Sequence, residues 1–464
     1  MIEPVIFAQD STRKSLTFAD NFKKYMDTTY SVFIETFGCQ MNFSDSEIVA
    51  SLMQQNDYSL VNNASEAHVI FLNTCSIREN AEQRIRGRLR ELKALKKKNP
   101  DLIIGILGCM AERLKETLLK EEQMVDLIAG PDAYRSLPEL ISKATNGLRA
   151  SDVQLSGIET YDDISPIRYD SNGIAAFISI MRGCQNFCSY CVVPYTRGKE
   201  RSRNPETIIA EAQQLFDSGY RDITLLGQNV NSYAWMQEYN FSKLIEKVAQ
   251  INPLLRVRFA TSHPKDLSDE LIMTIAKHEN ICRSIHLPLQ SGSTAVLERM
   301  NRGYSREFYM NRIETIRKHI PDCGLSTDLI SGFCGETEED HQQTLSLIEW
   351  AGYDLAYLFA YSERPNTFAA DNLNDDVPEE VKSRRLSELI KVQREISHRN
   401  NKLDIGTITE VLVEGNSKRS DEQLSGRNSR NKVVVFPRMN FKVGDYVKVK
   451  ILSCTTATLI GEAI

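Results

Sequence analysis

Short apolar runs alternate with amphipathic stretches along the first third of the chain. The runs VFIETFGC (32–39), AHVIFLNTC (67–75), LIIGILGC (102–109) and VDLIAGP (125–131) are almost continuously apolar, as strands buried on both faces are. Stretches with helical spacing follow three of them, at 44–55, 77–98 and 110–121. This repeated order of strand and helix predicts an open parallel sheet covered on both faces.

The alternation resumes with different strands in the middle of the chain. Six apolar runs lie at 175–181, 222–228, 256–261, 284–289, 325–333 and 355–362, and helical stretches separate them. One helix is marked by Asn204 as N-cap, Pro205 at its first position and Gly219 after its end. Six such units predict a partial (β/α)6 barrel, with its chemistry on the loops that follow the strands.

The last 60 or so residues change character. A charged helical stretch at 378–401 leads to segments at 407–415, 431–437 and 445–454 that alternate with period two, and these predict a small all-β barrel. The predicted fold is therefore α/β and multidomain. We divide it into a leader (1–30), an N-terminal open-sheet domain (31–150), a central barrel (170–401) and a C-terminal β-barrel (402–464).

Three strands of the N-terminal domain each end on a cysteine, at Cys39, Cys75 and Cys109. In open α/β sheets ligands bind at the carboxyl ends of the strands, so the fold is expected to gather these thiols at one edge. A single free cysteine is most often a small buried hydrophobe. Three cysteines at the same topological position instead favour a metal site.

A second trio, GCQNFCSYC, follows the first predicted barrel strand and contains Cys184, Cys188 and Cys191. A 4Fe–4S cluster needs four ligands, so three thiolates leave one iron open to chelate S-adenosylmethionine. Phe187 and Tyr190 are suited to shield such a cluster. The alternative is a zinc site, which needs a fourth ligand, and the candidates are His263 and His286 at the ends of later strands.

Composition narrows the class of protein. The 464 residues are 41% hydrophobic and 25% charged, with no run near the roughly 18 apolar residues that span a bilayer. The N-terminus lacks the pattern of a secretion signal, which predicts a cytoplasmic protein with reduced thiols. At a net charge of −6, nucleic acid would have to bind through local basic stretches, and two occur, at 78–98 and 416–442. The first is also consistent with a solvated helix face.

Several long motifs occur together and in order: ETFGCQMNFSDSE, NTCSIRENAEQR, GCMAERLK, RGCQNFCSYCVVPYTRGKERSR, LLGQNVNSY, SHPKDLSDELI, HLPLQSGSTAVLERMNRGYSRE, GETEEDHQQTL and VLVEGNSKRS. Over 32–464 the chain resembles the methylthiotransferases of the radical S-adenosylmethionine (SAM) superfamily. The resemblance implies an auxiliary 4Fe–4S cluster on Cys39, Cys75 and Cys109, and a radical 4Fe–4S cluster on Cys184, Cys188 and Cys191. One SAM would donate a methyl group and another would supply the 5′-deoxyadenosyl radical.

The expected reaction is methylthiolation of N6-isopentenyladenosine next to the tRNA anticodon (position 37), to give 2-methylthio-N6-isopentenyladenosine. Relatives that act on threonylcarbamoyladenosine or on a ribosomal-protein aspartate are alternatives. So is a non-catalytic RNA-binding protein with structural metal sites. Flavodoxin or ferredoxin as electron donor and a sulfur source are expected partners, and the C-terminal barrel matches the TRAM RNA-binding domain.

Other site residues are assigned by position. Many radical SAM enzymes carry Gly-Gly-Glu where this chain has Gly227, Gln228 and Asn229, so the SAM candidates are Gln228, Asn229, Gln290, Ser291 and Asp328. Cys334 stands where the family pattern suggests proline, and is expected to be a neutral replacement. Basic residues of the C-terminal barrel could contact tRNA phosphates: Lys418, Arg419, Arg427, Arg430 and Lys432.

Overall fold

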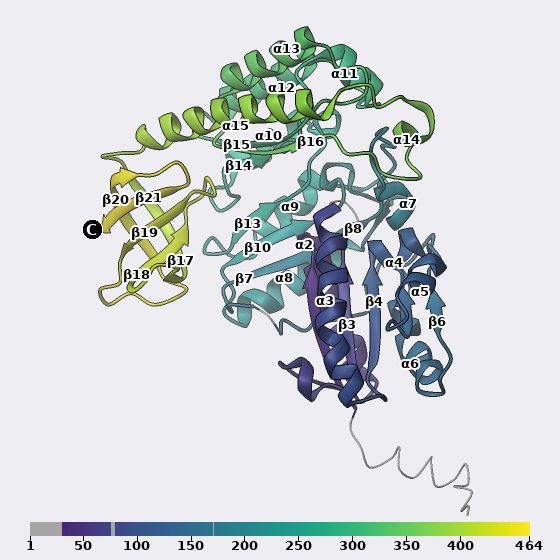
Figure 1. Cartoon of the computed structure of the whole chain (residues 1–464). Coiled ribbons are helices and arrows are strands. Elements are labelled where there is room, and N and C mark those ends of the chain that lie inside the picture. Colours follow the sequence, from purple (N-terminus) through teal and green to yellow (C-terminus); the bar gives the residue numbers. More distant parts are fainter. Residues whose placement is uncertain (1–29, 76–78, 170) are drawn as a thin grey trace, which may run out of the picture.

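The computed structural model describes residues 30–75, 79–169 and 171–464 (Figure 1). The expected leader falls outside the described residues, except for Tyr30. Among the residues described, no helix combines the length and apolarity needed to cross a bilayer.

The N-terminal part is a six-stranded, wholly parallel sheet in the order β2-β1-β3-β4-β5-β6. Its strands are β1 Ser31–Phe37, β2 Ser59–Leu60, β3 Val69–Thr74, β4 Ile103–Gly108, β5 Leu127–Ala129 and β6 Ala150–Asp152. The helices are α2 Gln40–Gln55, α3 Glu79–Lys98, α4 Cys109–Leu114, α5 Glu116–Glu121 and α6 Leu137–Thr145. Every residue of β3 and β4 is buried, because separate apolar clusters cover the two faces of the sheet.

The central part is an open barrel of two three-stranded parallel sheets, β7-β10-β13 and β14-β15-β16. The strands are β7 Ala175–Ser179, β10 Asp222–Leu226, β13 Arg256–Phe259, β14 Ser284–His286, β15 Gly324–Ser331 and β16 Leu355–Ala360. A parallel bridge from Val257 to Ile281 joins the sheets. The main covering helices are α8 Pro205–Asp217, α9 Phe241–Ala249, α10 Asp269–Lys277, α12 Arg306–His319 and α13 Glu338–Ala351. Asn204 caps α8 through the amide N–H of Glu206.

Shorter elements shape the loops after the barrel strands. The loop with the second cysteine trio runs from β8 Met181–Arg182 to α7 Val193–Arg197, and β9 Arg201–Ser202 pairs antiparallel with β8. The remaining short elements are β11 Ala234–Trp235, β12 Tyr239–Asn240, α11 Thr294–Arg299, α14 Phe368–Asn372 and the single turns Ala64–Glu66, Tyr134–Ser136, Val230–Ser232 and Pro264–Asp266.

The long helix α15 Glu379–Lys402 leads from the central barrel to a closed β-barrel (Figure 1). Its strands are β17 Ile408–Ser417, β18 Ser420–Arg427, β19 Val433–Pro437, β20 Tyr446–Cys454 and β21 Thr458–Ala463, in the order β17-β18-β19-β21-β20. All pairs are antiparallel except β19 with β21. The segment after β18 packs against the amino ends of β13 and β14: Arg256 donates to the carbonyl of Arg427, and the Arg283 amide donates to the Ser429 hydroxyl.

The predicted α/β architecture, with an open parallel sheet, a partial barrel and a small β-barrel, is confirmed. One expected element differs. The single helix expected at 110–121 is divided into α4 and α5 at Lys115, whose φ of +48° lies in the left-handed region.

Candidate metal centres

Cys39, Cys75 and Cys109 follow three adjacent strands, β1, β3 and β4, and the fold brings them together. The thiols influence one another's ionisation: Cys75 lowers the pKa of Cys39, and the charge of Cys39 raises the pKa of Cys109. The approach is close enough that a Cβ on Gly38 would lie 2.8 Å from the Cβ of Cys75. Only glycine fits at position 38, so the glycine of the motif FGC lets the end of the first strand pack directly against Cys75.

Two buried asparagines, which sequence reasoning missed, form hydrogen bonds beside this first trio. Asn42 Oδ1 accepts hydrogen bonds from the Cys39 amide and thiol, both at 3.3 Å, and its Nδ2 donates to Asn73 Oδ1 and to the Thr74 carbonyl, both at 3.2 Å. Asn73 Nδ2 returns a bond to the Asn42 carbonyl at 2.8 Å. Both side chains are fully buried. Asn42 therefore ties the Cys39 turn to the strand end that precedes Cys75.

The thiols of the first trio differ in acidity. The hydrogen bond with Cys75 lowers the pKa of Cys39 to about 6, against the opposing effect of burial and with further help from the positive charge of Arg197. Burial raises the pKa of Cys109 above its usual value. Cys75 and Cys109 are buried as whole residues, whereas Cys39 keeps exposed surface although its thiol is desolvated. The pKa of Cys39 is therefore shifted in the direction that favours ligation, because thiolates are the ligating form.

Cys184, Cys188 and Cys191 line the loop between β8 and α7, and Cys184 and Cys188 are buried. The loop begins at Gly183 with φ of +82°, where an added Cβ would lie 2.0 Å from the Lys199 carbonyl oxygen. Burial raises the pKa of Cys184 to about 11 and of Cys191 to about 12. The charge of Cys188 adds to both shifts, and that of Cys184 adds to the shift of Cys191. The three thiols are therefore close enough to interact electrostatically.

An arginine contacts each trio. Arg302 Nη1 donates to Cys188 Sγ, and Arg197 Nε donates to Cys109 Sγ, both at 3.2 Å. Both guanidinium groups are buried. Sequence reasoning did not single out either residue, because each is distant in sequence from the thiol that it contacts. Phe187, expected to shield the loop, is 48% exposed.

The width of the trios distinguishes between kinds of metal site. Sulfurs that share one tetrahedral zinc ion stand about 3.8 Å apart, as Zn–S bonds of about 2.3 Å require. Among the described residues, the sole group of three His, Cys, Asp or Glu side chains whose ligand atoms all lie within 4.8 Å is Glu338, His341 and Glu388. In neither cysteine trio do all three sulfurs lie within 4.8 Å of one another, so neither is arranged as the ligands of a single zinc ion are.

The Glu338, His341 and Glu388 group is an ion-pair cluster on the outer helices. Arg384 pairs with Glu338 at 2.6 Å and with Glu388 at 2.8 Å, and His341 Nε2 lies 2.7 Å from Glu388 Oε2. Since the carboxylates are already neutralised, we assign no metal to it.

Unpartnered polar atoms collect on the loops after β10 and β13, beside the second trio. Several buried oxygen and nitrogen atoms there have no hydrogen-bond partner: Gln228 Oε1, Asn229 Oδ1, Asn231 Oδ1 and Nδ2, Ser262 Oγ and His263 Nε2. Burial, together with the charges of Arg302 and Lys265, lowers the pKa of His263 to about 2, so the imidazole is neutral. Buried polar groups are normally paired, so these atoms fit a polar ligand.

The remaining SAM candidates lie on the other half of the barrel. Gln290 has φ of +69° and its backbone bonds to β15, while Ser291 is fully buried and contacts Thr344. Ser291 therefore has a partner within the fold. Asp328 lies on β15 with its Oδ2 3.4 Å from His286 Nε2, and both side chains are half-buried. Of the five candidates, Gln228 and Asn229 carry the unpartnered atoms.

The five basic candidates of the C-terminal barrel divide into two sets. Lys418 and Arg419 are exposed at the β17–β18 hairpin tip. Arg427 pairs with Glu414 at 2.6 Å, and Arg430 pairs with Asp404. Lys432 is buried and pairs with Asp404 at 2.8 Å and Asp354 at 3.1 Å. The last three form ion pairs that join the C-terminal barrel to the central barrel or close its own hairpin, whereas Lys418 and Arg419 have no ion-pair partner in the described chain. The phosphate contacts of all five stay a prediction.

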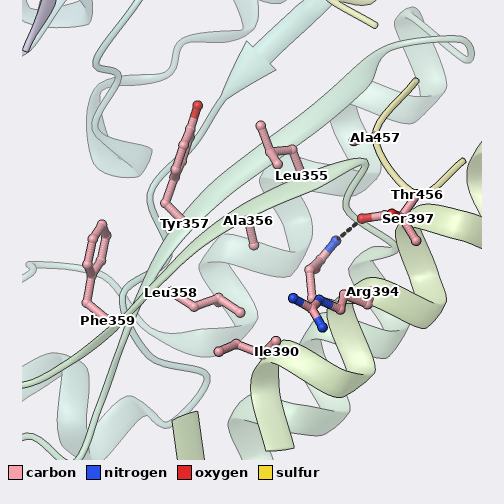
Figure 2. Close-up of a pocket in the computed structure, with 11 residues that line it drawn as sticks. Leu355, Ala356, Tyr357, Leu358, Phe359, Ile390, Arg394, Ser397, Thr456 and Ala457 are labelled. Carbon is pink, nitrogen blue, oxygen red and sulfur yellow. Dashed lines mark hydrogen bonds between the residues drawn. The ribbon is translucent and has the colours of Figure 1, made fainter. Parts of the chain in front are cut away.

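A separate cavity of about 430 Å3 lies along β16, between α15 and the β20–β21 turn (Figure 2). Within it Gln393 donates to Ser397 Oγ at 3.0 Å, and Arg394 is its charged residue. Its lining, all within the described chain, includes no cysteine, so it does not belong to either trio.

Three families match consecutive parts of the chain. Residues 31–130 match "Uncharacterized protein family UPF0004", residues 178–348 match the radical SAM superfamily and residues 402–464 match the TRAM domain. The first match covers the first trio, the second covers the second trio, and the third covers the C-terminal barrel.

Curated relatives match nearly the whole chain. A protein of Amoebophilus asiaticus is 56% identical over 449 residues, which cover 94% of this chain and 92% of the relative. One from Bacteroides fragilis is 53% identical over 453 residues, which cover 97% of this chain and 99% of the relative. Both are named tRNA-2-methylthio-N(6)-dimethylallyladenosine synthase. The chain belongs to this synthase family.

Solved structures agree on the fold alone. The radical SAM methyltransferase TsrM from Kitasatospora setae superposes with a TM-score of 0.57 at 12% identity, over 74% of this chain and 77% of that one. The cobalamin-dependent radical SAM enzyme OxsB gives a TM-score of 0.51 at 13% identity, over 81% of this chain and 57% of that one. This member of the synthase family therefore shares the radical SAM fold.

Cys334, expected to be a neutral replacement, follows β15 and lies outside both trios. Its side chain is buried with Phe333, Tyr361 and Met300 in a small apolar cluster, and its thiol interacts with the Tyr361 hydroxyl. Tyr190 packs at the edge of the same cluster. Cys334 therefore acts as a packing residue beneath the second trio.

Proposed function

We propose that this chain methylthiolates N6-isopentenyladenosine next to the tRNA anticodon, giving 2-methylthio-N6-isopentenyladenosine. The observation that carries the proposal is the pair of cysteine trios, one at the ends of β1, β3 and β4 and one on the loop before α7, in a chain whose relatives bear the synthase name over nearly their whole length. A tRNA substrate and ten free cysteines support a cytoplasmic location.

We assign the auxiliary 4Fe–4S cluster to Cys39, Cys75 and Cys109, and the radical cluster to Cys184, Cys188 and Cys191. When bound, the clusters and SAM supply radical generation, sulfur and the methyl group. The protein holds and orients them: Gln228 and Asn229 offer unpartnered amide oxygens to SAM, and buried arginines donate to one thiol of each trio.

Substrate binding is assigned to groups outside the metal sites. Lys418 and Arg419 project from the C-terminal barrel and are positioned to contact tRNA phosphates, which orient a substrate without reading its bases. The target base must unstack to reach the cofactors. Unstacking costs less free energy in a single-stranded anticodon loop than in a duplex. A low-potential donor such as flavodoxin or ferredoxin and a sulfur source complete the reaction.

Mass spectrometry of tRNA nucleosides from a strain lacking this chain tests the assignment. We expect 2-methylthio-N6-isopentenyladenosine to disappear, N6-isopentenyladenosine to accumulate, and wild-type protein but not Cys188→Ala to restore the product. Persistence of the methylthiolated nucleoside would refute the assignment. Loss of a methylthiolated threonylcarbamoyladenosine instead would identify the other tRNA substrate, and loss of ribosomal-protein modification the protein substrate.

A further inference from the structure

A buried group of charged residues joins the two cysteine trios. At its centre is Asp45 of α2, six residues after Cys39, with a side chain that is 0% exposed. Its Oδ1 accepts from Arg182 Nη1 at 2.9 Å and its Oδ2 accepts from Arg197 Nη2 at 2.7 Å. Arg182 comes two residues before Cys184, and Arg197 comes six residues after Cys191. One carboxylate of the N-terminal sheet domain therefore holds both ends of the loop that carries the second trio.

Arg197 also reaches the first trio. While its Nη2 pairs with Asp45, its Nε donates to Cys109 Sγ at 3.2 Å. The arginine belongs to α7, next to the second trio, yet its donors face a ligand of the first. A planar guanidinium can make both contacts at a fixed angle, which a lysine ammonium cannot. The geometry at one centre is thereby linked to the geometry at the other.

Neighbouring groups fix this arrangement. Arg182 Nη2 donates to the Pro131 carbonyl at 2.9 Å, and its guanidinium lies 4.9 Å from the centre of the Tyr161 ring. The Tyr134 hydroxyl donates to Asp45 Oδ2 at 3.4 Å. Arg201 pairs with Asp132 at 2.8 Å, one residue beyond Pro131. The pairs lie between the sheet domain and the barrel and are almost inaccessible to solvent.

Two physical effects follow from this placement. Buried ion pairs contribute little net stability compared with apolar packing, but they permit few alternative arrangements and so fix relative position. In addition, an N–H group that donates to a cluster thiolate stabilises the extra negative charge of the reduced cluster, which raises its reduction potential. Asp45 holds Arg197 in the orientation that makes the second effect possible.

We propose that Asp45 and Arg197 are positioning residues that fix the two metal centres relative to each other, and that the Arg197–Cys109 hydrogen bond raises the reduction potential of the auxiliary centre. This inference rests on the proposed function in one respect, namely that both trios hold iron–sulfur clusters.

The first test isolates the auxiliary centre. In the full chain with Cys184, Cys188 and Cys191 replaced by alanine, the midpoint potential is measured by an EPR-monitored redox titration. Arg197→Gln should shift it to more negative values by about 59 mV, equivalent to a tenfold change in the reduction equilibrium. Arg197→Lys should shift it less, since the positive charge remains, and it carries the test if the glutamine variant does not retain iron.

Arg312→Lys is the matched control, because Arg312 pairs with Asp269 on the outer barrel helices and should leave the potential unchanged. A loaded Arg197 variant with the wild-type potential would overturn the tuning role.

The second test uses the chain with both centres present. Asp45→Asn keeps the shape of the side chain but removes the charge that pairs with both arginines. With iron content retained, the magnetic interaction between the two reduced centres should change, and wild-type EPR line shape and relaxation in the variant would overturn the positioning role. If Asp45→Asn loses iron, the same measurement on Arg197→Lys decides the question.

Neither test uses tRNA, so the outcomes separate the two proposals. A wild-type chain that binds no iron would refute the inference and the proposed cofactors together. A wild-type chain with both clusters, tRNA activity and unmoved EPR parameters in the variants would refute the inference alone.

Discussion

At the scale of single residues, the six thiols occupy two different environments. The first trio has an acidic thiol at Cys39 that donates to Asn42, whereas the second lies in a loop where burial raises the pKa of Cys184 and Cys191. Each trio receives one arginine N–H, from Arg197 or from Arg302. The two sites therefore share a ligand count but differ in their electrostatics, consistent with separate tasks.

Replacing one thiol in each trio should separate those tasks. Cys188→Ala removes a ligand of the proposed radical cluster and should abolish formation of 5′-deoxyadenosine from SAM. Cys75→Ala removes a ligand of the proposed auxiliary cluster and should retain part of that cleavage while forming no methylthiolated nucleoside. Both products are measured by liquid chromatography and mass spectrometry. Equal cleavage by wild type and Cys188→Ala would contradict the assignment.

A buried carboxyl group gives a pH-dependent prediction. Glu112 is 1% exposed, both its oxygens lack a hydrogen-bond partner, and burial raises its pKa to about 7 against the attraction of Lys115. The pKa of Glu112 in the folded protein lies above the unfolded value of 4.5. Its contribution to the free energy of unfolding is therefore fully present below pH 4.5 and is lost as pH rises through 7.

Glu112→Gln should therefore become more stable relative to wild type as pH increases from 5 to 8, by on the order of 3 kcal/mol at most. Thermal unfolding of both proteins across that range measures the difference. A difference that does not change with pH would show that Glu112 is ionised in the folded protein throughout.

At the scale of secondary-structure elements, helix α3 has two kinds of basic residue. Arg86 pairs with Glu121 and Glu122, Arg88 pairs with Glu35 and Glu91, and Lys96 pairs with Asp126. Others are exposed and have no ion-pair partner in the part of the chain that the structure describes: Arg84, Arg90, Lys93 and Lys97. The first set attaches the helix to the sheet. In the second set Arg90, Lys93 and Lys97 lie along one side of the helix, and we propose that this side contacts tRNA.

Removing three of the exposed charges should weaken tRNA binding. In a variant with Arg90→Ala, Lys93→Ala and Lys97→Ala, the slope of log affinity against log salt concentration should fall by up to about 0.7 to 0.9 for each tRNA phosphate that these side chains no longer neutralise. Fluorescence anisotropy at several salt concentrations measures it. The control replaces three exposed lysines of other helices, Lys247, Lys318 and Lys391, and an equal effect there would assign the change to net charge alone.

Besides Arg256, the buried Arg258 contributes to the contact between the two barrels. Arg258 of β13 pairs with Asp222 at 2.7 Å and donates to the Asn428 carbonyl at 3.0 Å. Arg258→Met leaves Asp222 buried without its partner and should destabilise the protein by about 3–5 kcal/mol, as measured by denaturant unfolding. Arg258→Met with Asp222→Asn should recover part of this loss, and a double variant less stable than the single one would contradict the explanation.

Sequence patterns predicted the long apolar strands and most helices, because local periodicity sets them, but missed the short strands β2 and β6 and the barrel strands β18 and β21. The convergence of Cys39, Cys75 and Cys109 followed from the rule that parallel strands end at one edge. By contrast, Asp45 and Arg197 are 152 positions apart, and no local pattern links them. The basic run that contains Arg430 and Lys432 suggested RNA binding, because the sequence does not reveal that Asp404 and Asp354 pair with them.

At the scale of the whole molecule, the two cysteine-bearing regions that we propose as metal sites meet across a domain boundary. The N-terminal sheet supplies one trio and Asp45, the barrel supplies the other trio and Arg197, and the C-terminal barrel packs at the opposite, amino-terminal ends of barrel strands β13 and β14. The carboxyl ends of the barrel strands, where the second trio and the unpartnered polar atoms lie, are thus left to the cofactors and the base.

The central claim is that the chain holds two separate iron–sulfur clusters, and the iron content per chain tests it most directly. Anaerobically purified wild-type protein should contain about eight iron atoms, since each 4Fe–4S cluster contributes four. Replacing Cys39, Cys75 and Cys109 by alanine should leave about four, and so should replacing Cys184, Cys188 and Cys191. A wild-type protein with four or fewer irons, or with zinc in their place, would contradict the account.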